Sequence, residues 1–359
     1  MGKGLVSMEI YCIAVFGTSL LTIKTFSVMK KIFSFVALIA ALAGVFACNK
    51  VEAPQPNEAN QLTRPVTKGY GDVIMACYVE TNDVNPLNAG DYVLEDGETP
   101  FFDIVELFAA NIHKDDAGNP TLYLNDKLAP VLEDGGVNTY VRPLQDKGIK
   151  VLLTVLGDWQ HIGVANMTSA QTTQFAEILA YAVEKYGLDG IGFDDEYADY
   201  YSTNSTSYSE IISKLHALMP SNKIITVFDW GNTHTINSAA AACIDYAYHG
   251  YFGSYMGLEY CNITGMTNER WSASSLNLGN YNSTSIASDY ASRTMNDGYG
   301  AMMFFNLRTR NDRDPLALFD AVSEVIWLES VSCDNGNRSR DAGSDPDGYT
   351  ITYDMATNN

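Results

Sequence analysis

Short apolar runs alternate with longer amphipathic segments along the chain from residue 73 onward. The runs predict eight strands, at residues 73–80, 103–111, 150–156, 189–196, 223–229, 245–252, 274–280 and 300–306. The amphipathic segments predict helices at residues 169–186, 207–219, 285–297 and 314–328. Eight strand–helix units in about 260 residues is the number that closes a barrel. We therefore predict an α/β fold, a (β/α)8 TIM barrel that forms a single catalytic domain, over residues 71–329.

An open, doubly wound sheet is the alternative fold for such an alternating pattern. That fold normally has fewer strands, and the sequence has no GxGxxG or Walker motif to support a nucleotide-binding version of it. Residues 330–359 are rich in Asp, Asn, Ser and Gly and predict a polar C-terminal tail. This tail is either a disordered end or contributes one short strand at residues 348–353.

The first 48 residues have the pattern of a targeting region. The basic segment Met29–Lys31 precedes an apolar run over residues 32–47, as in a secretory signal. The run ends at Cys48, directly after a small residue, which resembles a bacterial lipobox, whose cysteine is lipidated and becomes the mature N-terminus. A second apolar stretch over residues 10–23 is explained either by translation that starts at Met29 or by an N-terminal transmembrane helix.

Residues 49–70 carry several prolines and asparagines and predict a flexible tether. With the signal before it, this segment predicts a secreted monomer, attached through lipidated Cys48 to the outer membrane or cell surface of a Gram-negative bacterium. The formal net charge of −21 repels DNA and RNA, so we expect no nucleic-acid partner.

The cysteines and histidines of the chain lack the spacing of ligands. None of the six cysteines lies in a C-x-x-C pair, and the five histidines show no H-x-x-x-H pattern. We therefore predict neither a metal site nor a cofactor. Cys77 and Cys243 are predicted to be small core residues, and Cys261 and Cys333 would pair only in an oxidising compartment.

Three consecutive carboxylates, Asp194, Asp195 and Glu196, end the fourth predicted strand. Side chains alternate along a strand, so Asp194 and Glu196 share one face, with Cα atoms roughly 6.5 Å apart, and Asp195 points the other way. Chemistry in a barrel lies at this end of the strands. Crowded like charges raise one pKa, which suits a general acid near neutral pH. A calcium site or a solvated acidic turn is the alternative interpretation.

Paired carboxylates can catalyse glycoside hydrolysis in two ways. Ordinary retaining enzymes place the two carboxylates on opposite sides of the sugar, whereas two carboxylates on one strand favour a substrate-assisted reaction. In that reaction Glu196 protonates the glycosidic oxygen and later deprotonates the attacking water. Asp194 accepts a hydrogen bond from the 2-acetamido N–H of the substrate and stabilises the oxazolinium ion. This reaction requires no metal.

The segment Asp189–Glu196 resembles the signature D-G-x-D-x-D-x-E of the family 18 glycoside hydrolases. Its departure is Gly192, which stands where the family has a middle aspartate that shares a proton with the aspartate at position 194. Further segments resemble the bacterial endo-β-N-acetylglucosaminidases of that family, and the similarity spans about residues 72–328; they are residues 80–88, 108–112, 142–157 and 245–255. We expect Gly192→Asp to change the pH optimum without loss of the fold.

The resemblance also assigns two aromatic residues. It implies that the hydroxyl of Tyr251 supports the acetamide carbonyl, whereas a buried strand tyrosine is the alternative. It places Phe304 nearest the aromatic floor of the −1 sugar site, on which a sugar face can stack. Five further residues near predicted strand ends are candidates to line glycan subsites, with packing or exposed-loop roles as the alternative; they are Asn111, Trp159, His161, Trp230 and His249.

The resemblance implies an endo-β-N-acetylglucosaminidase that cleaves between the two core N-acetylglucosamines of an N-linked glycan or glycoprotein, with high-mannose glycans favoured. A chitinase is the first alternative, but it needs a long groove lined with tryptophans and the chain has only four. A non-catalytic, surface glycan-binding lipoprotein is the second, and Gly192 keeps it open.

Overall fold

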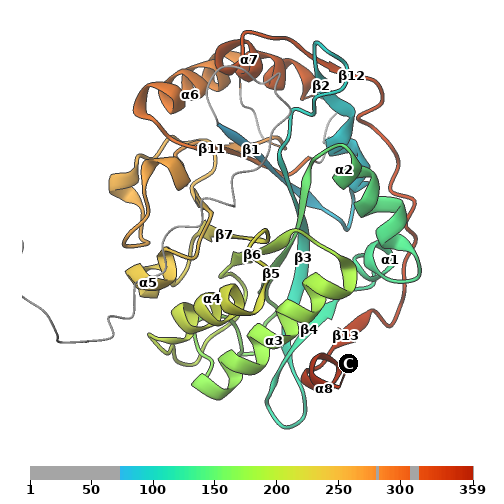
Figure 1. The fold of residues 1–359 in the computed structure, drawn as a ribbon, viewed down its shortest axis with the longest axis vertical. Coiled ribbons are helices and arrows are strands. Elements are labelled where there is room, and N and C mark those ends of the chain that lie inside the picture. The colour runs from blue at the N-terminus through green and yellow to red at the C-terminus, as the bar shows by residue number, and fades with distance from the viewer. Residues whose placement is uncertain (1–72, 280–282, 308–314, 359) are drawn as a thin grey trace, which may run out of the picture. The chain divides into compact units, whose positions relative to one another are not determined.

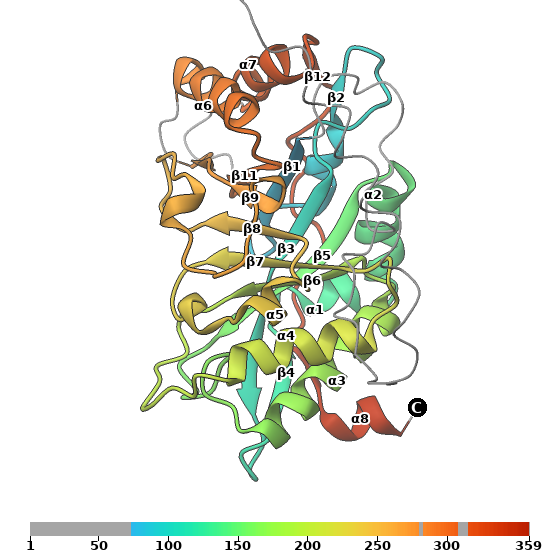
Figure 2. The same ribbon diagram turned by 60° about the vertical axis from the view of Figure 1, so that its left-hand side comes forward.

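Parallel strands enclose the interior of a barrel in the computed structural model, which describes residues 73–279, 283–307 and 315–358 (Figure 1). The barrel strands, in chain order, are β1 (Ile74–Glu80), β3 (Ile104–Lys114), β5 (Lys150–Gly157), β6 (Gly190–Asp194), β7 (Ile224–Asp229), β8 (Tyr246–His249), β9 (Trp271–Ser272), β10 (Ser275–Asn277) and β11 (Ala301–Phe305). Their order in the sheet is β10-β11-β1-β3-β5-β6-β7-β8-β9. The part of this order from β6 through β7 and β8 to β9 can be followed in Figure 2.

The two ends of this order belong to one stretch of chain. Strand β9 pairs with β8, and a few residues later β10 pairs with β11, so residues 271–277 occupy one strand position. The nine short strands thus fill eight positions, and the predicted (β/α)8 barrel is confirmed.

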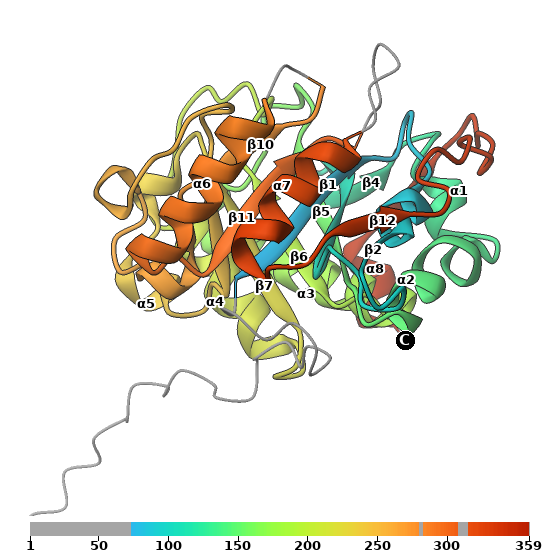
Figure 3. The same ribbon diagram turned by 90° about the horizontal axis from the view of Figure 1, so that it is seen from above.

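Four long helices cover the barrel, and each lies where the sequence pattern predicts one. They are α3 (Ser169–Tyr186), α4 (Ser207–Leu218), α6 (Thr284–Asp297) and α7 (Leu316–Ile326). Helix α3 begins with a capping box between Thr168 and Gln171 and ends at Gly187 in the left-handed conformation, with φ 59°. Helices α6 and α7 pack together outside β11 (Figure 3).

The remaining connections are short. After β4 (Pro120–Leu124), which pairs antiparallel with β3, come α1 (Ala129–Leu132), the π-helical η3 (Val137–Val141) and α2 (Arg142–Asp146). The 3-10 turns are η2 (Pro86–Asp91), η4 (Thr233–Thr235), η5 (Leu258–Tyr260) and η6 (Asn268–Arg270), and α5 (Ser238–Ala241) precedes β8.

Residues beyond 330 are fastened to the barrel. Strand β12 (Val331–Cys333) pairs with β2 (Tyr92–Leu94), and β13 (Tyr349–Ile351) pairs with β4, where a short strand was expected. The final helix, α8 (Tyr353–Thr357), packs on α3. Cys261 and Cys333, whose pairing the sequence left open, are not joined in a disulfide in this structure.

Two apolar layers surround the strands. The inner layer fills the barrel and includes Tyr78, Leu152, Phe228 and Tyr248. The larger outer layer packs the strands against the helices. No helix in the described ranges is long and apolar enough to span a membrane. The signal, Cys48 and the tether lie outside the described residues.

Candidate active site

Strand β6 delivers the acidic residues to the mouth of the barrel. Ile191 and Phe193 point outward into the apolar layer, so Gly192 and Asp194 face inward. The strand ends at Asp194, earlier than the predicted residue 196, and Glu196 therefore stands in the turn beyond the last strand residue. Asp194 is 3% exposed, whereas Glu196 is partly open to solvent.

Asp195 points away from this pair, as predicted from strand alternation. One carboxylate oxygen accepts a hydrogen bond from the Tyr200 hydroxyl at 2.6 Å. The other oxygen accepts from the backbone and side-chain nitrogens of Asn232, each at 2.8 Å. With both oxygens used in this way, Asp195 joins the β6 turn to the loop after β7. Within the described residues, no group of three acidic, histidine or cysteine side chains is arranged to hold a metal ion.

The two inward carboxylates are arranged to keep a proton. Burial, followed by the charges of Glu196 and Asp195, raises the pKa of Asp194 well above its usual range. Burial and the charge of Asp195 raise the pKa of Glu196 as well. The Oδ1 atom of Asp194 is buried and has no hydrogen-bond partner among the described residues. A protonated carboxyl beside a second carboxyl is what general acid catalysis requires.

A close backbone crossing fixes the turn that carries Glu196. The Gly157 amide donates to the Glu196 carbonyl at 3.0 Å, and a Cβ at position 157 would lie only 2.5 Å from the backbone of Ala198. One residue further on, the Trp159 amide donates to the Tyr197 carbonyl at 2.6 Å. The loops after β5 and β6 therefore run together, and only glycine fits where they touch.

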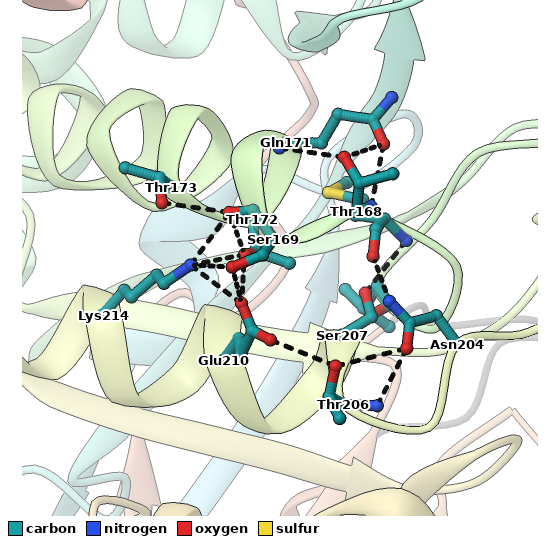
Figure 4. A network of polar contacts seen from close by, with 12 residues as sticks. Thr168, Ser169, Gln171, Thr172, Thr173, Asn204, Thr206, Ser207, Glu210 and Lys214 are labelled. Atoms are coloured by element: carbon teal, nitrogen blue, oxygen red, sulfur yellow. Dashed lines mark hydrogen bonds and ion pairs between the residues drawn. The ribbon is translucent and has the colours of Figure 1, made fainter.

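A polar network anchors these same loops at the start of α3 and α4 (Figure 4). Glu210 accepts hydrogen bonds from Ser169, Thr172 and Lys214, at 2.7, 2.9 and 2.9 Å. The Asn204 side chain donates to the Met167 carbonyl at 2.7 Å. The network fixes the far ends of both loops and thereby the mouth of the barrel.

Aromatic side chains rim the mouth beside Glu196. Trp159 is 62% exposed and lies 5.6 Å from the ring of Tyr197. The charge of Glu196, followed by burial, raises the pKa of Tyr197. Tyr197 was not a candidate from the sequence, although its position directly after Glu196 is a signal that could have identified it.

The loop after β8 carries the second aromatic pair. Tyr251 is 56% exposed, and its ring meets that of Trp230 edge-on at 5.3 Å. Gly250 allows this approach, because a Cβ there would lie 2.8 Å from the Trp230 ring. Both residues are therefore at the mouth, as the sequence analysis placed them, and Tyr251 is not a buried strand tyrosine.

His249 does not line the mouth, which corrects its prediction as a glycan contact. It is buried, and its Nδ1 accepts from the Tyr251 amide at 3.1 Å while Nε2 lies 3.1 Å from the Ser254 carbonyl. Burial lowers the pKa of His249 to about 4, so the ring is neutral near pH 7, with its proton on Nε2. Its role in the structure is to hold the loop that presents Tyr251.

The prediction that Phe304 forms the aromatic floor of the −1 sugar site is also wrong, by one residue along β11. It is 0% exposed and packs outward against Phe101, Phe102 and Phe319, with ring centroids 5.5–5.7 Å apart. Strand alternation turns the next residue, Phe305, into the barrel mouth.

Phe305 is therefore the aromatic residue of β11 that faces the barrel mouth. Its ring stacks on Phe252 at 4.7 Å and meets Phe108 at 5.8 Å. Asn111 lies within β3, and its side-chain amide donates to the Gly157 carbonyl at 3.4 Å. His161 bonds to the Asp199 carbonyl at 2.8 Å and so supports the β6 loop.

No protein-family model matches the sequence. An endo-beta-N-acetylglucosaminidase of a Flavobacterium species is 39% identical over 266 residues, which cover 71% of this chain and 81% of that protein. Endo-beta-N-acetylglucosaminidase F1 of Elizabethkingia meningoseptica is 32% identical over 283 residues, which cover 74% and 81%. The structure of EndoBT-3987 of Bacteroides thetaiotaomicron with a Man9GlcNAc2Asn substrate has a TM-score of 0.62 at 27% identity, over 81% of this chain and 72% of that chain.

The barrel and the acidic end of β6 thus define a glycoside hydrolase of family 18. A chitinase of Rhizomucor miehei shares the fold, with a TM-score of 0.51 at 13% identity. Within the class, the chain belongs to the bacterial endo-β-N-acetylglucosaminidases, because two such relatives above 30% identity are each covered over 81% of their length.

Proposed function

We propose that this enzyme hydrolyses the β-1,4 bond between the two core N-acetylglucosamines of N-linked glycans, with high-mannose glycans favoured. The observation that carries the proposal is the buried Asp194 beside a partly exposed Glu196, both with raised pKa values. The likeness to EndoBT-3987, solved with a Man9GlcNAc2Asn substrate and with a Man5GlcNAc product, supports this substrate class.

The reaction we propose is substrate-assisted and retains the anomeric configuration. Glu196 donates its proton to the glycosidic oxygen as the 2-acetamido oxygen of the substrate attacks C1. Asp194 accepts a hydrogen bond from the acetamide N–H and stabilises the oxazolinium ion. Glu196 then takes a proton from water, which opens the ring of the intermediate at C1.

Exposed aromatic side chains would hold the sugars in place. Phe305 and Phe252 stack beside one another at 4.7 Å and offer an apolar surface to the sugar that reacts. Tyr251 would direct its hydroxyl to the acetamide carbonyl, and Trp159 and Trp230 would contact sugars further out on the mouth.

The attachment of the protein is a separate proposal that rests on the sequence before residue 49. A signal over residues 29–47 followed by Cys48 supports lipidation at this cysteine, on a monomer held at the outer membrane or cell surface. Labelling of producing cells with an alkyne fatty acid tests it. We expect labelled wild type and an unlabelled Cys48→Ser variant, and equal labelling of both would contradict the proposal.

The activity is tested with a chain that starts after Cys48, incubated with a denatured high-mannose glycoprotein. We expect the intact mass of the glycoprotein to fall to that of the protein carrying one N-acetylglucosamine at each glycosylation site. Chitin oligosaccharides, offered in parallel, should remain intact. Unchanged masses together with measurable glycan binding would favour the non-catalytic binding protein instead.

A further inference from the structure

Gly192 has no side chain, and the space that a side chain there would fill is occupied by the carboxyl group of Glu106. A Cβ at position 192 would lie 2.3 Å from Oε2 of Glu106 and 2.9 Å from its Cδ. Glu106 stands on β3 and points into the barrel, where it is 0% exposed. A side chain at position 192 and the Glu106 carboxyl therefore exclude each other.

Two threonines hold the Glu106 carboxyl in that place. Thr154 donates to Oε2 at 2.8 Å, and Thr226 donates to Oε1 at 2.5 Å. These threonines are the register neighbours of Gly192 on β5 and β7. The carboxyl is thus held level with position 192, and neutral hydroxyls are its only hydrogen-bond partners among the described residues.

Asp194 is the next residue of β6 after Gly192 that faces the barrel interior. Alternate inward residues of a strand are roughly 6.6 Å apart. The buried Tyr78 hydroxyl has no hydrogen-bond partner in the described ranges, and burial, followed by the charges of Glu106 and Asp194 among others, raises its pKa well above the usual range. Tyr248 on β8 faces Glu106 as well, while β5 and β7 contribute the two threonines, which do not titrate.

We propose that Glu106 is a positioning residue that replaces the missing middle aspartate. Its carboxyl comes from β3 and occupies the space that a side chain at position 192 would fill. There it shares one proton with Asp194 and sets the charge of Asp194 during the reaction. The inference rests on the substrate-assisted reaction proposed above. It assigns a function to a buried carboxyl that the fold alone does not need.

The charges of the pair follow from burial. Two carboxylates in one apolar interior do not both ionise readily, so the pair carries a single negative charge. At rest the charge lies on Glu106, which has two hydroxyl donors, and the proton lies on Asp194. As positive charge develops on the oxazolinium ion, Asp194 releases this proton and becomes the anion that faces it.

Glu106 receives the released proton, so the total charge of the pair does not change. Burial raises the pKa of Glu106 to about 7, which suits a group that accepts and returns a proton near neutral pH.

The first test is Glu106→Gln in the full-length protein, because glutamine keeps the shape but accepts no proton. We expect kcat near pH 7 to fall roughly tenfold or more, with KM little changed. The remaining activity should rise with pH, because Asp194 must then lose its proton to solvent. A kcat that is unchanged, or that falls equally at every pH, would overturn the proposal.

The second test moves the carboxyl from β3 to β6. Because a Cβ at position 192 would lie 2.3 Å from Oε2 of Glu106, we expect Gly192→Asp alone to destabilise the fold, whereas the sequence alone led us to expect an intact fold. Combined with Glu106→Ala, it should restore kcat and the wild-type pH optimum. The matched control, Glu106→Ala with Gly192→Asn, fills the same space without a titrating group. Equal recovery in both double variants would reduce Glu106 to a packing role.

A readout without substrate separates this inference from the proposed function. Infrared difference titration of the wild type should show two coupled protonation steps of buried carboxyls. Glu106→Gln should remove one step and shift the other to lower pH, since a neighbouring negative charge is gone. An unshifted second step would sink the inference even in an active enzyme. A wild type without hydrolytic activity but with both steps would instead sink the proposed reaction.

Discussion

Asp195 and Asn232 join the ends of β6 and β7: one carboxylate oxygen of Asp195 accepts both the backbone and the side-chain nitrogen of Asn232, at 2.8 Å each. The Tyr200 hydroxyl occupies the other oxygen. Asp195 is thereby held in place next to Glu196. Burial, followed by the charge of Asp195, raises the pKa of Glu196. Asp195, which points away from the mouth, thus contributes to the raised pKa of Glu196, which points into it.

We therefore expect Asp195→Asn to move the alkaline limb of the kcat profile to lower pH. Loss of the neighbouring charge lowers the pKa of Glu196, and Glu196 must be protonated to act as an acid. The measurement is kcat against pH. Asn232→Ala is the control: it removes one donor but keeps the charge, so it should cost about 1 kcal/mol of stability and leave the limb in place.

Glu196→Gln should lower kcat by a factor on the order of 10² to 10⁴ or more and leave the affinity for glycan nearly unchanged. Glutamine keeps the shape of the side chain but has no proton to donate. Glu184→Gln, the same change on the exposed outer face of α3, should behave as wild type. Turnover and glycan binding would be measured on both variants, and robust turnover in Glu196→Gln would refute its role as the general acid.

The neighbouring residues Phe304 and Phe305 should respond to alanine in opposite ways. Phe304→Ala leaves a hole between β11 and α7 and should cost about 3–5 kcal/mol of unfolding free energy, with KM unchanged if the protein folds. Phe305→Ala should raise KM, because the sugar loses its apolar floor, and should cost less stability. Urea unfolding and steady-state kinetics distinguish the two, and the reverse result would return Phe304 to the site floor.

Local patterns were enough to place β6 and the orientation of Asp195, because alternation along a strand depends only on neighbouring residues. The same rule failed for Phe304, since it assigns faces only once the register of β11 is known. His249 was misplaced because β8 ends there and the following loop folds back over it.

Glu106 lay beyond what the sequence could reveal. Which inward residues meet at one level of a barrel depends on the stagger of all its strands. The register of β5, β6 and β7 brings Thr154, Gly192 and Thr226 together, and β3 supplies the carboxyl above them. A glycine in a motif that otherwise carries carboxylates was the only sign of it in the sequence.

The Glu210 network makes the loops at the mouth sensitive to acid. Hydrogen bonds from Lys214, Ser169, Thr172 and Thr206, with the Lys214 contribution largest, lower the pKa of Glu210 to about 2 in the folded protein. The unfolded chain has a glutamate pKa of about 4.3. The stabilisation is therefore fully present above pH 4.3 or so and is lost as the pH falls toward 2.

We expect Glu210→Gln to lower the unfolding free energy at pH 7 by about 1 kcal/mol, a modest value because solvent screens the group. The difference from wild type should shrink as the pH falls from about 5 toward 2, since protonated Glu210 resembles glutamine. Urea unfolding at several pH values measures it. A pH-independent difference would mean that the shape of the side chain, and not its charge, holds α3 to α4.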